Sequence, residues 1–187
     1  MDRFGERHDG DGVTVRAVRH IRGGKSASAL LALDSARAAD GALFYIQEGF
    51  ADVAITSTLI KTLRATPQIL VAAPGTGYFL EFLTARLMLD YATNVLSEPS
   101  ACNLEVRYGT TTGVVASQTV ECTGFLYQAA DTYTNCLPKI DAIGATATLE
   151  NLTLVLFNNG AAEFAGNAGG DCVLRVRTNY RIHQLLA

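Results

Sequence analysis

Three arginines near the C-terminus carry the clearest chemical pattern in this sequence. In the stretch 172–183, CVLRVRTNYRIH, most of the residues at even positions are apolar. The residues at odd positions include Arg175, Arg177 and Arg181. Successive side chains of a β-strand point to opposite faces, so this period of two predicts a strand with one face in a core and one cationic face outward. Because guanidinium groups bind carboxylates, we expect the three arginines at a subunit interface, with a solvated or salt-bridged sheet face as the alternative.

Other combinations of reactive residues do not complete a recognisable site. The stretch Gly23–Ser26, GGKS, is similar to the end of a phosphate-binding loop, but Arg19 stands where that pattern has its first glycine. Cys172 and His183 are an odd number of residues apart on the predicted strand, so they face opposite ways and do not form a thiol–imidazole pair. We therefore predict no catalytic, cofactor-binding or metal-binding residues and no enzymatic activity.

Carboxylates and aromatic residues leave two further functions to weigh. Glu81 with Asp90, or Glu121 with Asp131, could serve a glycosidase only if the two carboxylates face each other across a cleft. Tyrosines and phenylalanines are scattered at strand positions, without the interleaving among basic residues that is typical of a single-strand nucleic-acid platform. We therefore expect no direct nucleic-acid partner.

The cysteines indicate a structural role. None of the four stands in a C-x-x-C pair and no histidines are interleaved with them, which argues against zinc and thioredoxin-type sites. No secretory signal precedes them, so we expect reduced, mostly buried thiols in a protein made in a cytoplasm. They are Cys102, Cys122, Cys136 and Cys172. No stretch approaches the ~20 apolar residues of a membrane span, so no membrane partner is expected.

Basic residues gather at the two ends of the chain. The net charge is only −3, but the first 25 residues contain six basic side chains. Residues 1–12 are polar and punctuated by glycine, and they cannot build a core. We expect residues 1–50 to form an arm, with a solvated basic tail as the alternative, and residues 51–187 to form the folded domain. The cations of the arm that we expect to contact a partner are Arg16, Arg19, Arg22 and Lys25.

Short apolar segments separated by turn residues follow the arm. We predict strands at 43–46, 68–73, 78–91, 104–108, 114–120, 132–137, 143–148 and 152–157, besides the closing strand. The strand 152–157 is apolar on both faces, so we expect it to be central and covered on both sides. We expect the first strand to end at Gly49, the strands 68–73 and 78–91 to form a hairpin, and the strands 104–108 and 114–120 to form another. A helix is the alternative for 78–91, and a short helix is expected from Thr56 or Ser57 to about Leu63. This spacing predicts a mainly β, jelly-roll-like β-sandwich with one or two short helices.

Short motifs between residues 63 and 183 carry a family resemblance. They are LRATPQ at 63–68, VAAPG at 71–75, LEF at 80–82, LDY at 89–91, QAADT at 128–132, EFAGN at 163–167 and YRIH at 180–183. In these motifs the chain resembles a family of tailed-bacteriophage virion proteins encoded among the head genes, which comprises capsid cement or decoration proteins. The first 50 residues depart from the shorter beginning that is usual in the family.

The resemblance implies a structural protein of the virion. Such a protein binds the outer capsid shell and stabilises the joints between subunits of the major capsid protein. The resemblance further implies assembly in the host bacterial cytoplasm, no cofactor, and self-association as a homotrimer, with a dimer as the alternative. A carbohydrate-binding module on the virion surface, a structural protein of the neck or tail, and a small hydrolase are the other functions that stay open.

Overall fold

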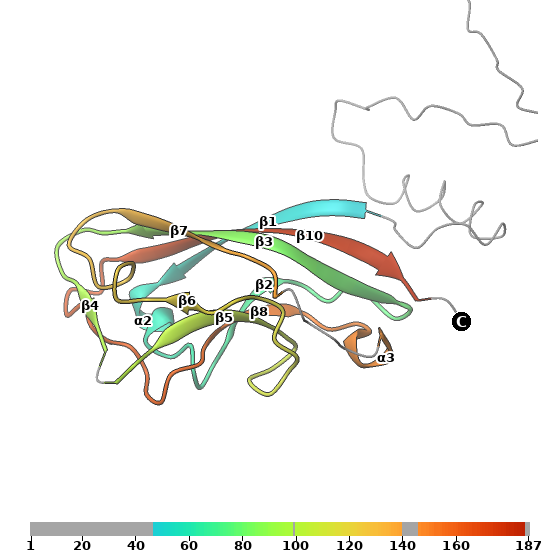
Figure 1. Ribbon diagram of the computed structural model, residues 1–187. Helices are drawn as coiled ribbons and strands as arrows, with labels where there is room; N and C mark the ends of the chain where they lie inside the picture. The colour runs from blue at the N-terminus through green and yellow to red at the C-terminus, as the bar shows by residue number, and fades with distance from the viewer. Residues whose placement is uncertain (1–46, 99, 140–145, 186–187) are drawn as a thin grey trace, which may run out of the picture. The chain divides into compact units, whose positions relative to one another are not determined.

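The computed structural model describes residues 47–98, 100–139 and 146–185 (Figure 1). Close to half of this part of the chain is in strands. The strands are β1 (Gln47–Thr56), β2 (Gln68–Val71), β3 (Tyr78–Asp90), β4 (Leu96–Ser97), β5 (Asn103–Tyr108), β6 (Val120–Glu121), β7 (Thr132–Cys136), β8 (Leu154–Asn158), β9 (Ala165–Gly166) and β10 (Val173–Gln184). Two four-residue helices, α2 (Ser57–Ile60) and α3 (Thr146–Leu149), lie in the connections.

Eight of these strands form two antiparallel sheets that pack face to face (Figure 1). Sheet A has the order β1-β10-β3-β7 and sheet B the order β2-β8-β5-β6, while β4 and β9 form a small separate pair. Apart from β4 and β9, each strand along the chain joins the opposite sheet from the strand before it. The one exception in this part of the chain is β6, which follows β5 in sheet B. This is the strand arrangement of a jelly roll, and it confirms the predicted fold class.

The core lies between the two sheets because each sheet presents an apolar face to the other. Leu87 of β3, Leu174 of β10, Leu104 of β5 and Leu156 of β8 are fully buried there. Removing one leucine side chain of this kind from water contributes about 1.5–3 kcal/mol. Strand β8 is buried along its whole length, as predicted for a central strand.

Strand β10 holds sheet A together. It pairs with β1 on one side, from Thr56↔Val173 to Gln47↔Ile182, and with β3 on the other. The predicted closing strand is therefore confirmed, and it lies in the middle of its sheet. Strand β3 runs for 13 residues in the segment predicted as a long strand, so the helical alternative for that segment is wrong.

The predicted hairpin between β2 and β3 is wrong. Strand β2 pairs with β8 in sheet B, whereas β3 pairs with β10 and β7 in sheet A. The turn at 74–77 therefore carries the chain from one sheet to the other. Turn residues show where a strand ends, but they do not show which sheet the next strand joins. The second predicted hairpin is confirmed in part, because β5 pairs with a β6 that contains only Val120 and Glu121.

Three further expectations differ from the structure. Gly49 lies inside β1 opposite Tyr180, where a Cβ would come within 2.8 Å of the tyrosine ring, so a larger residue there would require the ring to move. Helix α2 ends at Ile60 rather than near Leu63, and Thr56 makes no side-chain capping bond. The end of the predicted strand 143–148 lies in helix α3.

The predicted arm overlaps the folded domain at its end. Strand β1 begins at Gln47, so residues 47–50 belong to sheet A. The rest of the arm, the predicted strand 43–46 and residues 143–145 lie outside the described residues. Within the part of the chain that the structure describes, no helix is long and apolar enough to span a bilayer.

Candidate functional site

The predicted row of arginines lies on the outer face of sheet A. Leu174 and Val176 of β10 point into the core. Arg175 and Arg177, which alternate with them, point away from it. The pairing register sets acidic residues of β1 beside this row, with Asp52 opposite Arg177. The alternation that the sequence showed is therefore the alternation between core and surface.

Two of the arginines bind carboxylates of the strands on either side. Arg175 donates from Nε and Nη2 to Oδ2 of Asp90 on β3, at 3.2 and 2.7 Å. Arg177 donates from Nε and Nη2 to the two carboxylate oxygens of Asp52 on β1, both at 2.7 Å. The hydrogen bonds from Arg177 lower the pKa of Asp52, and the same bonds raise the pKa of Arg177. The pair of Arg177 and Asp52 is bidentate, a geometry that an arginine guanidinium can form and a lysine ammonium cannot.

The third arginine belongs to a small network at the other end of the face. Arg181 donates from Nε to Oε1 of Glu48 at 2.6 Å and lies 3.6 Å from the carboxylate of Glu81. Glu81 also lies 2.8 Å from Nε2 of His183, whose ring stacks on Phe79 with 5.0 Å between ring centroids. His183 thus interacts with residues of the outer face, as predicted from its odd separation from the buried Cys172.

The acidic partners of the three arginines are therefore in the same chain. The sequence pattern predicted carboxylates of a neighbouring subunit as partners, and for contacts between subunits this stays a prediction. The salt-bridged sheet face, which was the alternative, describes the contacts within the chain. The side chains of Arg175 and Arg177 are about 60% exposed and that of Arg181 is 40% exposed, and surface ion pairs contribute little to the stability of a fold.

Apolar side chains stand between these ion pairs. Phe50 of β1 is 64% exposed, Met88 of β3 is 48% exposed and Tyr133 of β7 is 71% exposed. The guanidinium carbon of Arg177 lies 5.1 Å from the centroid of the Phe50 ring. Met88 and Tyr133 are directly opposite each other in the register. Tyrosine, phenylalanine, methionine and arginine are the residue types that are enriched at protein interfaces.

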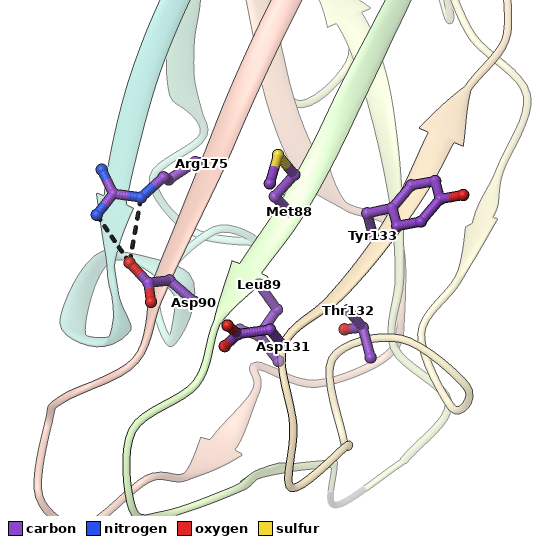
Figure 2. Close-up of a pocket in the computed structure, with 7 residues that line it drawn as sticks. All are labelled: Met88, Leu89, Asp90, Asp131, Thr132, Tyr133 and Arg175. Carbon is purple, nitrogen blue, oxygen red and sulfur yellow. Dashed lines mark hydrogen bonds and ion pairs between the residues drawn. The ribbon is translucent and has the colours of Figure 1, made fainter.

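A shallow pocket of about 310 Å³ lies at one end of this face (Figure 2). Figure 2 shows Met88 between Arg175 on one side and Tyr133 on the other. The backbone N–H of Tyr91 donates to Oδ1 of Asp131 at 2.9 Å, which fixes the carboxylate at the rim. The lining residues are Met88, Leu89, Asp90, Asp131, Thr132, Tyr133 and Arg175.

Two of the other groups considered for catalysis, the Glu81–Asp90 pair and the thiols, do not form a site. Glu81 and Asp90 lie on one strand, nine residues apart, which is about 30 Å and too far for a glycosidase pair. All four cysteines are free and buried, as predicted. Burial raises the pKa of Cys136 to about 11, so this thiol is not activated as a nucleophile. The described residues contain no group of three or more histidine, cysteine or acidic side chains that could hold a metal ion.

The predicted cations of the arm cannot be placed on this face, since Arg16, Arg19, Arg22 and Lys25 lie outside the described residues. The exposed apolar residues were not singled out from the sequence. Met88 could have been found, because the predicted strand 78–91 sets it on the same face as Arg86. Phe50 was assigned to the arm, and Tyr133 was taken as a core or cross-strand residue.

No family model matches this chain, and no curated protein matches it either.

Proposed function

We propose that this protein is a structural protein of a tailed-phage virion, of the capsid cement or decoration type. It binds the outer capsid shell and stabilises the joints between subunits of the major capsid protein. The single observation that carries the proposal is the outer face of sheet A, where exposed Phe50, Met88 and Tyr133 alternate with ion-paired arginines. The sequence motifs that resemble cement proteins point to the same class.

The arrangement of this face suits a protein partner. Apolar side chains that stay exposed lose their contact with water when a partner covers them, which favours association. The guanidinium groups are already held by carboxylates, so they enter an interface in a defined geometry and with their charge balanced. Exposed apolar side chains spread over several strands suit the surface of a protein better than a small molecule, which usually binds in an enclosed pocket.

The N-terminal segment adds reach to this face. Strand β1 is at the edge of sheet A, and 46 residues precede it in the sequence. A segment with several cations can bind along an acidic groove of a partner. In our proposal, Arg16, Arg19, Arg22 and Lys25 bind the capsid shell while the outer face of sheet A rests on it.

A binding experiment with undecorated capsids tests the proposal. We expect the full chain to co-sediment with the capsids and to raise the temperature at which they release DNA. Phe50→Ala should weaken the binding at least tenfold, and removal of residues 1–25 should reduce occupancy further. Ile69→Ala is the matched control, because Ile69 is an exposed aliphatic residue of sheet B. Full occupancy and unchanged capsid stability with both altered proteins would refute the proposal.

A carbohydrate-binding module is the second candidate, and the pocket in Figure 2 favours it. The exposed ring of Tyr133 offers a surface on which the apolar face of a sugar can stack. The carboxylate of Asp131 and the guanidinium of Arg175 can bind hydroxyl groups. Jelly rolls occur in viral coat proteins and in lectins alike, so the fold agrees with both candidates. Glycan-array binding that is lost in Tyr133→Ala would support this second function.

A further inference from the structure

Strands β3 and β7 place three cross-strand pairs of residues on the outer face of sheet A, at one end of the sheet. Each pair forms one row. The register pairs Arg86 with Asn135 and Met88 with Tyr133, and its continuation by one step beyond Leu89↔Thr132 sets Asp90 beside Asp131. We call these six residues the three-row patch. From one end to the other, it is cationic, then apolar, then acidic.

The cationic end has a charge without a counter-ion. Arg86 is exposed and stands opposite Arg177, whose guanidinium is bound by Asp52. Like charges directly opposite each other in a sheet are unfavourable. Among the residues that the structure describes, none forms an ion pair or a hydrogen bond with the side chain of Arg86. This guanidinium is therefore available to a partner.

The acidic end has free acceptors. Asp131 is exposed, and only its Oδ1 accepts a hydrogen bond from a described residue, the N–H of Tyr91. Asp90 accepts both bonds from Arg175 on Oδ2, which leaves Oδ1 without a described donor. The two carboxylates are neighbours, so a cation that reached both would relieve their repulsion.

The two ends lie at equal distances from the apolar row. Arg86 and Asp90 are each two residues from Met88 on the same strand, which is about 7 Å. A two-fold axis that runs across the strands, along the Met88–Tyr133 row, exchanges the two ends. It sets Arg86 of each copy against Asp90 and Asp131 of the other copy. The Met88–Tyr133 rows of the two copies then pack on each other. A surface with this property is self-complementary, as a two-fold interface requires.

We propose that the three-row patch binds the same patch of a second copy and forms a two-fold dimer. The proposal rests on the proposed function in one respect, since it takes the outer face of sheet A as a protein-binding face. It assigns Met88 and Tyr133 to the second copy and leaves the part of the face around Phe50 on β1 to the capsid shell. A second copy fits better than an unrelated surface, because it supplies an acid, an apolar pair and a cation at the required spacing. The two-fold arrangement also favours a dimer over the trimer that the family resemblance implies.

Charge reversal gives a sharp test with the full-length chain. We expect the unaltered protein to dimerise with rising concentration in analytical ultracentrifugation. Arg86→Glu sets two acidic ends against each other, and Asp131→Arg sets two cationic ends against each other, so each variant should raise the dimer Kd at least tenfold. An equimolar mixture of the two variants should form a heterodimer, because Glu at position 86 then meets Arg at position 131 and the other contact is native. Ile69→Glu, on sheet B, should leave the dimer unchanged.

The outcomes separate this proposal from the proposed function. A protein that stays monomeric at all concentrations, or a mixture in which the heterodimer does not form, overturns the dimer. If such a monomer still binds capsids, only the dimer is refuted. If the dimer forms as described but does not bind capsids, only the capsid function is refuted. A monomer whose glycan binding disappears in Tyr133→Ala would assign the patch to saccharide and would also overturn the dimer.

Discussion

The outer faces of the two sheets carry similar side chains in different surroundings. On sheet B, Phe157 is only 6% exposed, and the guanidinium carbon of Arg107 lies 4.3 Å from its ring centroid. On sheet A, Phe50 has a comparable arginine, Arg177, beside its ring but remains mostly exposed. Phe157 is covered by residues of its own sheet and turns, although Ile69 on the same sheet is 58% exposed. No described segment covers Phe50 on the outer face of sheet A.

The ion pairs of the two faces differ in the same way. Glu105 is only 4% exposed; it binds Arg107, and its Oε2 accepts a hydrogen bond from Nδ2 of Asn159 at 2.9 Å. Arg107 also donates to the backbone carbonyl of Thr111. The pair of Asp52 and Arg177 is more than half exposed. The buried pair on sheet B therefore supports the fold, whereas the exposed pair on sheet A contributes little to it.

The largest effect should come from the covered aromatic residue. Phe157→Ala removes a buried ring from the outer face of sheet B, and we expect a loss of about 3–5 kcal/mol in the free energy of unfolding. Chemical denaturation followed by circular dichroism measures this loss. Tyr133→Ala on sheet A is the matched control and should change stability very little. Equal losses in the two variants would show that both faces are part of the core.

The covered ion pair should have the next largest effect. Glu105→Ala leaves the guanidinium of Arg107 in a partly buried position without its carboxylate. We expect a loss of about 2–3 kcal/mol, at the low end for buried pairs, because Arg107 keeps some contact with solvent. Replacement of both residues, as in Glu105→Leu with Arg107→Met, should cost less than the single change. A larger loss in the double variant than in the single one would contradict this account.

The exposed ion pair should have the smallest effect on stability and a clear effect on titration. The pKa of Asp52 lies below its ordinary value of 3.8, mainly because of its hydrogen bonds to Arg177. A lowered pKa in the folded state means that the pair stabilises the fold above pH 3.8 and that this contribution is lost as the pH falls through the folded-state pKa. Arg177→Gln should therefore raise the pKa of Asp52, as measured by NMR of the side-chain carboxyl. An unchanged pKa would show that the pair does not form in solution.

Much of the fold could be predicted from local patterns. The alternation in 172–183 predicted β10 and the outward direction of its arginines, and the continuous apolar run at 152–157 predicted a buried strand. Turn residues located the ends of β2 and β3. The same residues led to the wrong hairpin, because the chain crosses between sheets at 74–77 and no local signal marks such a crossing.

The candidate site was predicted only in part. The three arginines were found, but their partners lie 85 to 133 positions away in the sequence. Glu48, Asp52 and Asp90 carry no mark that assigns them to β10. Tyr133 was counted among the core or cross-strand aromatic residues, since a short strand such as β7 does not reveal which of its faces a second sheet covers.

The sequence by itself determined which side chains share a face. Successive side chains of a strand point to opposite faces, so residues two positions apart lie on the same face. It also determined that the thiols are buried and that the strands are short enough for a sandwich. Only the tertiary structure decided which strands are neighbours, which carboxylates meet the arginines and which sheet stays uncovered. These depend on the register of segments that are distant in the chain, and register is set by the packing of the whole core.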